Sequence, residues 1–94
     1  MKARKSILVD DWDACCICGG RAEACHHVFG GPNRKISDRE GFTVPLCNAC
    51  HNMSDHGVHF NREADLRLKR WAQRVYEKNH SREEFIRLIG RSYL

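Results

Sequence analysis

The sequence predicts a small α+β domain whose parts are held together by a bound metal ion. The chain has 94 residues, enough for a single domain (1–94) but too few to bury a large core without an additional cross-link. All six cysteines lie in residues 15–60, together with two short β-prone runs. Residues 61–94 instead show the three- and four-residue apolar spacing of amphipathic helices.

The N-terminal stretch and the overall composition exclude several classes of protein. Residues 1–14 are a polar lead-in, in which the apolar run 7–9 is a candidate short strand. This run is too short for a signal peptide, and no run approaches the length of a membrane span, so we expect a cytoplasmic protein. The net charge of +4, from 16 basic and 12 acidic residues, is too small to identify a polyanionic partner by itself.

Two β-prone runs, 24–29 and 41–46, are expected to pair as strands of a ribbon. Pro45 has no amide hydrogen to donate, which predicts an edge position for the second strand. The glycine-rich turn at 30–32 follows the first strand and leads into a predicted loop. Three basic side chains on this loop are candidates for phosphate contacts: Arg34, Lys35 and Arg39.

Two helices are predicted in the C-terminal part of the chain. Asn61 is the expected N-cap of the first, and Ser81 with Glu84 forms a capping box that begins the second. Gly90 is the expected end of the second helix. We interpret their apolar faces as part of the core, although the stripe after residue 84 is also a candidate contact between two copies of the chain.

The cysteines form two CxxC pairs, which are typical of a zinc site. In a reducing compartment, clustered cysteines bind metal more often than they form disulfides. Zinc takes four soft ligands in a tetrahedron, and a site closed by four protein ligands is structural. Cys16 is interpreted as a bystander and Cys25 as a strand residue. The expected zinc ligands are Cys15, Cys18, Cys47 and Cys50.

Histidines form a second group. His26 and His27 are neighbours on the first predicted strand, so their side chains should point to opposite faces. His51 directly follows a zinc ligand, which would fix its backbone, and His59 lies just before the first long helix. His80 is expected at the surface.

The ordered combination of Cys-x-x-Cys, His26-His27-Val28 and Leu46-Cys47-x-x-Cys50-His51 resembles the HNH nucleases, which have a ββα-metal fold with an added zinc-binding cysteine quartet. The longer run through 26–38, the Pro-Leu-Cys at 45–47 and the Gly-Val-His-Phe-Asn at 57–61 are similar to a phage and prophage branch of this family, the recombination-enhancement nucleases. The resemblance covers about residues 15–76. It implies metal-dependent hydrolysis of DNA, and it raises a recombinase filament as a possible partner.

The resemblance also implies roles for single residues. His26 would bind a catalytic divalent ion such as Mg²⁺ or Mn²⁺, and His27 would be the general base that activates water. A histidine suits this task because its ordinary pKa of about 6.5 lies near neutral pH. His51 would be a second ligand of the catalytic ion. The third is less defined: His59 matches the family pattern best, and the competing ligands are Asp55 and His56.

In one position the chain departs from the family pattern. The family places an asparagine that orients the general base shortly before the last cysteine pair, and residues 41–45 contain none. Candidates to replace it are Asn33, Asp38 and Asn48. Without a replacement, we expect a site that binds DNA and metal but cuts poorly. The alternative functions are a zinc-ribbon module that binds DNA but does not cut it, and a zinc-held adaptor for proteins. Strand preference, sequence specificity and oligomeric state stay open.

Overall fold

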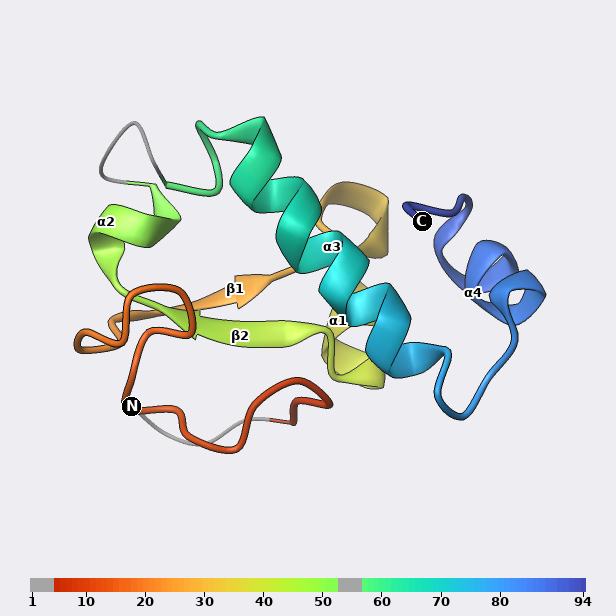
Figure 1. Ribbon diagram of the computed structural model, residues 1–94, viewed down its shortest axis with the longest axis horizontal. Helices are drawn as coiled ribbons and strands as arrows, with labels where there is room; N and C mark the ends of the chain where they lie inside the picture. The colour runs from red at the N-terminus through yellow and green to blue at the C-terminus, as the bar shows by residue number, and fades with distance from the viewer. Residues whose placement is uncertain (1–4, 53–56) are drawn as a thin grey trace.

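The computed structural model describes residues 5–52 and 57–94 and shows a small α+β architecture, as the sequence predicts (Figure 1). The two strands form a ribbon, and the long helix α3 passes diagonally across it with α4 at the far end of the molecule. In chain order the elements are β1 (Ala24–His27), the 3₁₀ turn η1 (Gly31–Asn33), α1 (Arg34–Glu40), β2 (Thr43–Leu46), α2 (Asn48–His51), α3 (Arg62–Tyr76) and α4 (Arg82–Ile89).

The strands β1 and β2 pair antiparallel, and their register decides which histidine faces the core. His26 lies opposite Val44, and His27 lies opposite Thr43. Directly opposed residues in an antiparallel pair project from the same face of the sheet. Since Val44 is fully buried in the hydrophobic core, His26 is on the core side and His27 is on the other side. Pro45 is tolerated because a two-stranded sheet consists only of edges.

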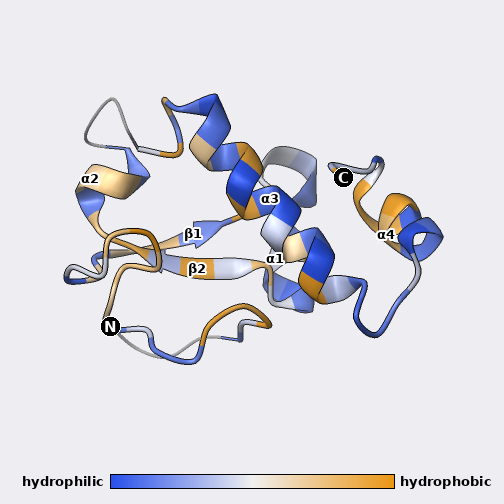
Figure 2. Cartoon of the chain, in the orientation of Figure 1, coloured by the Kyte–Doolittle hydropathy of each residue, from blue (hydrophilic) through white to orange (hydrophobic). Residues whose placement is uncertain are grey.

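Both C-terminal helices begin where the sequence predicts, and the second also ends where it predicts. The Asn61 side chain accepts a hydrogen bond from the Ala64 amide at the start of α3, and Ser81 and Glu84 form a reciprocal capping box on α4. Gly90 ends α4 with a φ of 109°, in the left-handed region. One face of each helix is apolar and the other is polar (Figure 2).

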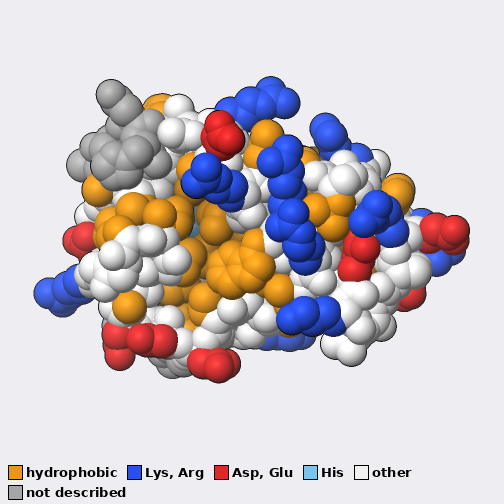
Figure 3. Space-filling view, viewed as in Figure 1, with side chains coloured by type: hydrophobic (Ala, Val, Ile, Leu, Met, Phe, Trp, Pro, Cys, Tyr) orange, Lys and Arg blue, Asp and Glu red, His pale blue; other side chains and the backbone are white. Residues whose placement is uncertain are grey.

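The apolar faces of both helices join the core. Phe85 and Ile89 of α4 are buried within the same chain, whereas Ile86 is 40% exposed, so the stripe after residue 84 is covered in part. Phe85 packs against Phe42 and Phe29 with ring centroids 6.3 and 5.6 Å apart. The opposite side of α3 carries Lys and Arg side chains at the surface (Figure 3). No helix in the described ranges has the length and apolar character needed to cross a bilayer.

Two local predictions were wrong. Residues 7–9 form no strand: the Ser6 hydroxyl accepts the amides of Leu8 and Val9, and the Ile7 amide donates to the Gly41 carbonyl. These backbone groups are therefore satisfied without a strand partner. The predicted loop after the glycine-rich turn is instead the helix α1, which ends at Gly41 with a φ of 81°.

Candidate metal centre and catalytic cavity

The four expected zinc ligands come together although they lie on two distant segments. Their Sγ atoms are all within 4.8 Å of one another, and those of Cys18 and Cys47 are 3.6 Å apart. A tetrahedron with Zn–S bonds of about 2.3 Å has S···S edges of about 3.8 Å. The four cysteines form no disulfide. This quartet therefore fits a structural metal ion, and four sulfur ligands favour zinc.

Without a cation, these sulfurs differ strongly in how readily they ionise. Burial opposes ionisation of Cys15, but amide hydrogen bonds, first that of Cys18, lower its pKa to about 6. Burial raises the pKa of Cys50, and hydrogen bonding to Cys47 adds to this effect. The negative charge of ionised Cys15 also raises the pKa of Cys50. A divalent cation removes this conflict, because its charge stabilises all four thiolates together.

The quartet also fixes the helix that carries His51. The Cys47 side chain is the N-cap of α2 and accepts a hydrogen bond from the Cys50 amide at 3.4 Å. His51 is the last residue of this four-residue helix. A helix this short is not stable alone, so the metal-binding turn supplies its support. The position of His51 therefore depends on the cysteine quartet.

His59 reaches the same place through a close contact between two backbones. The turn that begins at Gly57 lies against the end of α2, with hydrogen bonds from Val58 to the Cys50 carbonyl and from His59 to the His51 carbonyl. A Cβ on Gly57 would lie 2.9 Å from the His51 carbonyl oxygen, a distance that real Cβ atoms do not adopt. Glycine is thus needed for this contact, and the contact sets His59 beside His51.

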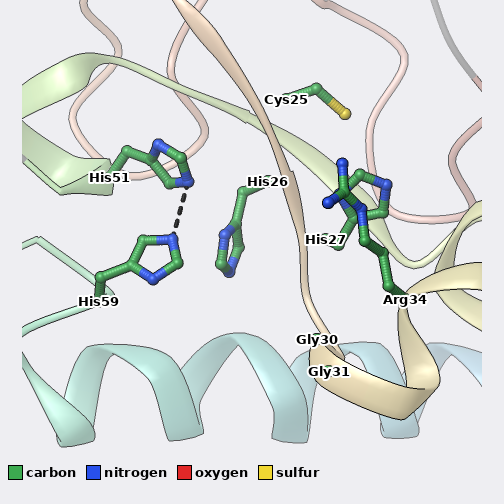
Figure 4. A pocket seen from close by; sticks show the side chains of 8 residues that line it. All are labelled: Cys25, His26, His27, Gly30, Gly31, Arg34, His51 and His59. Atoms are coloured by element: carbon green, nitrogen blue, oxygen red, sulfur yellow. Dashed lines mark hydrogen bonds between the residues drawn. The ribbon is translucent and has the colours of Figure 1, made fainter.

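His26, His51 and His59, hereafter the histidine trio, form a second group of potential metal ligands. One ring nitrogen of each lies within 4.8 Å of the others, and the Nε2 atoms of His51 and His59 are 3.0 Å apart. Figure 4 shows the three rings converging from β1, α2 and the turn before α3. The structure thus brings together the three residues that the sequence analysis assigned to the catalytic ion.

His26 has the unpaired nitrogen and the lowered pKa that are expected of a metal ligand. Its Nε2 atom is buried and, within the described chain, has no hydrogen-bond partner. Leaving such an atom without a partner costs about 1–3 kcal/mol. Burial, with the nearby charges of His51 and His59, lowers the pKa of His26 to about 3. Burial also lowers the pKa of His51. At neutral pH these imidazoles are therefore neutral, as metal coordination requires.

His27 lies on the other side of β1 and is held by a carboxylate. Its Nε2 atom is 2.7 Å from Oδ1 of Asp38 on α1. Of the candidates to replace the family asparagine, only Asp38 contacts His27, because Asn33 donates to the Ile89 carbonyl and Asn48 to Glu23. An ionised carboxylate can only accept, so in the neutral form of the ring Nε2 carries the hydrogen and Nδ1 carries the lone pair.

One cavity joins the two sides of β1. It has a volume of about 340 Å³ and lies at the lower end of the range for ligand pockets. Its wall includes the histidine trio, His27 and Arg34, as Figure 4 shows. The remaining lining residues are Cys25, Gly30 and Gly31. The trio and His27 thus border the same cavity from opposite sides of β1.

Two other described residues, Cys16 and His80, lie outside the quartet and the trio. Cys16 is outside the quartet, and burial with the charge of Cys15 raises the pKa of its thiol to about 12. Cys25 is a strand residue in the cavity wall, as predicted. His80 is exposed and stacks on Tyr76. The competing ligands Asp55 and His56 lie outside the described residues.

Comparisons of the chain with protein-family models, with curated proteins and with solved structures found no significant match.

Proposed function

We propose that this protein is a metal-dependent DNA endonuclease of the HNH type. The observation that supports this most directly is the shared cavity, which the histidine trio and His27 both line. The order of cysteines and histidines that resembles the HNH family supports the same proposal. In this proposal the cysteine quartet holds a structural zinc ion and takes no part in the chemistry.

The histidine trio would hold the catalytic divalent ion. Three protein ligands leave coordination positions open for substrate and water. When bound, such an ion supplies a positive charge to the phosphate and to the departing oxygen. Imidazole ligands accept several divalent metals, so the donor set does not distinguish Mg²⁺, Mn²⁺, Ni²⁺ and Zn²⁺ by itself.

His27 would be the general base. With Nε2–H donated to Asp38, the lone pair of Nδ1 takes a proton from a water molecule in the cavity. The water oxygen bonds to phosphorus, the P–O3′ bond breaks, and the 3′ oxygen takes a proton from solvent. The products are a 5′-phosphate and a 3′-hydroxyl. Asp38 touches neither water nor substrate in this scheme, so it acts as a positioning residue.

The biological setting proposed here comes from the family resemblance alone. It is DNA processing or recombination in a phage or prophage, with a recombinase filament as a candidate partner.

A plasmid-nicking assay across a series of divalent ions tests the proposed activity. The wild type should convert supercoiled plasmid to the open circular form only when a divalent ion is added, and His27→Ala should abolish this conversion. His80→Ala is the matched control, because His80 is an exposed histidine outside the cavity. If neither the wild type nor the control nicks DNA with any ion, the activity is absent. Salt-sensitive DNA binding that persists in His27→Ala would then indicate a zinc-ribbon binding module.

A further inference from the structure

Among the described residues that line the cavity, Arg34 is the one with a permanent positive charge. It is the first residue of α1, and it lines the cavity together with His27 (Figure 4). The helix that carries it is fixed to the end of β1, because the buried Ser37 hydroxyl donates to the Phe29 carbonyl at 2.7 Å and accepts from the Phe29 amide at 3.1 Å. Arg34 is thus an exposed cation on α1, a helix whose position is fixed by buried hydrogen bonds.

Arg34 lines the cavity and has no acidic partner in the described part of its wall. Arg39 pairs with Glu40 and Arg82 pairs with Glu77. Within residues 5–52 and 57–94, no hydrogen bond or ion pair involves the Arg34 guanidinium. Asp38 lies one helical turn further along α1, but the hydrogen bond recorded for its carboxylate goes to His27. The cavity therefore contains a cation that the described chain does not neutralise.

The geometry of a guanidinium group favours a phosphate as the anion that would neutralise it. A guanidinium presents planar paired donors that match two oxygens of a phosphate, whereas a lysine ammonium is a point charge. A phosphodiester bound in the cavity would be bordered by two groups of side chains. The trio lies on one side of β1, and His27 and Arg34 lie on the other side. Negative charge that develops on the non-bridging oxygens during attack would then face a fixed cation.

We infer that Arg34 binds a non-bridging oxygen of the phosphodiester that is cut, and so holds it between the histidine trio and His27. This inference rests on the proposed function. The sequence offered Arg34, Lys35 and Arg39 as equal candidates for phosphate contacts. Of these three, only Arg34 lines the cavity. The neighbouring Lys35 is exposed on the same helix, so its removal changes the net charge equally without changing the cavity wall.

The test compares Arg34→Ala, Arg34→Lys and the control Lys35→Ala. Each is assayed for plasmid nicking, for metal content, and for affinity toward a short DNA duplex at several salt concentrations. Arg34→Ala should nick about 10²-fold more slowly at saturating DNA with unchanged metal content. Arg34→Lys should recover only part of this loss, because it restores the charge but not the paired donors. Lys35→Ala should nick close to the wild-type rate.

The outcomes separate this inference from the proposed function. If the wild type nicks DNA, and Arg34→Ala and Lys35→Ala lose equally little in rate and affinity, the assignment of Arg34 is wrong and the nuclease proposal stands. If the wild type does not nick, the nuclease proposal fails, and affinity alone decides the role of Arg34. If Arg34→Ala then loses more DNA affinity than Lys35→Ala, the inferred contact between Arg34 and a DNA phosphate stands. Equal affinities of the two variants would overturn this contact.

Discussion

The Nε2 atom of His27 lies 2.7 Å from Oδ1 of Asp38, a residue eleven positions further along the chain and on a different element. This contact supplies a partner for His27 where the family pattern has an asparagine. It also assigns the hydrogen on the ring, because the carboxylate requires a donor. The arrangement resembles other pairs in which a carboxylate orients a catalytic histidine and sets its tautomer.

Replacing Asp38 should therefore slow catalysis without affecting metal binding. Asp38→Ala removes the acceptor, and the ring is then free to rotate or to change tautomer. We expect a fall in kcat of about 10²-fold or more, with little change in KM. Asp38→Asn keeps an oxygen acceptor and should lose less. Nicking rates at saturating DNA measure the effect, and a change in KM alone would contradict the orienting role.

Gly57→Ala should remove the catalytic ion while the structural ion stays bound. The added methyl group would lie 2.9 Å from the His51 carbonyl oxygen, so the turn must move away from α2 and take His59 with it. Metal analysis should show two ions per chain in the wild type and one in the variant, with loss of nicking. Phe60→Ala is the control, since this side chain lies in the same turn, is 68% exposed and does not line the cavity. Two ions in Gly57→Ala would show that the trio tolerates this displacement.

Ser37→Ala should destabilise the protein and reduce activity together. The buried hydroxyl makes two hydrogen bonds with the Phe29 backbone, and its loss leaves both of these groups without that partner. We expect the free energy of unfolding to fall by about 1–3 kcal/mol, measured by urea denaturation. Because α1 carries both Asp38 and Arg34, nicking should slow at temperatures where the variant is still folded. An unchanged urea midpoint would show that other contacts are sufficient to dock α1.

The low pKa of His26 predicts a dependence of stability on pH. Burial lowers this pKa from 6.5 to about 3, so below pH 6.5 the unfolded chain binds a proton that the folded chain excludes. The free energy of unfolding must then decrease as the pH falls from 6.5 toward 3, by at most about 1.4 kcal/mol per pH unit from this group. In protein with one zinc ion per chain, His26→Phe should show a shallower decrease between pH 6.5 and 5. Parallel curves would contradict the assigned burial.

The sequence predicted the features that depend on local chemistry. The caps at Asn61 and Ser81, the stop at Gly90 and the opposite orientation of His26 and His27 all follow from short-range rules, and the structure confirms them. The convergence of the two CxxC pairs was also predictable, because their spacing is specific for metal binding.

Features that depend on tertiary contacts were missed or left open. The helix α1 begins after a glycine-rich turn and is docked through Ser37, a residue with no recognisable motif around it. The choice of Asp38 over Asn33 and Asn48 depends on where each side chain points once α1 and α2 are packed. Gly57 is visible in the sequence, but the close approach that requires it is visible only in the structure.

The central claim is that a sulfur-bound ion supports a second site in which three imidazoles hold a hydrolytic ion. Crystals of the protein soaked with Mn²⁺, with anomalous diffraction recorded at the manganese and zinc edges, test this claim directly. We expect a zinc peak among Cys15, Cys18, Cys47 and Cys50 and a separate manganese peak among His26, His51 and His59. A zinc peak in the cysteine quartet with no metal between the three imidazoles, or one ion shared by both groups, would contradict it.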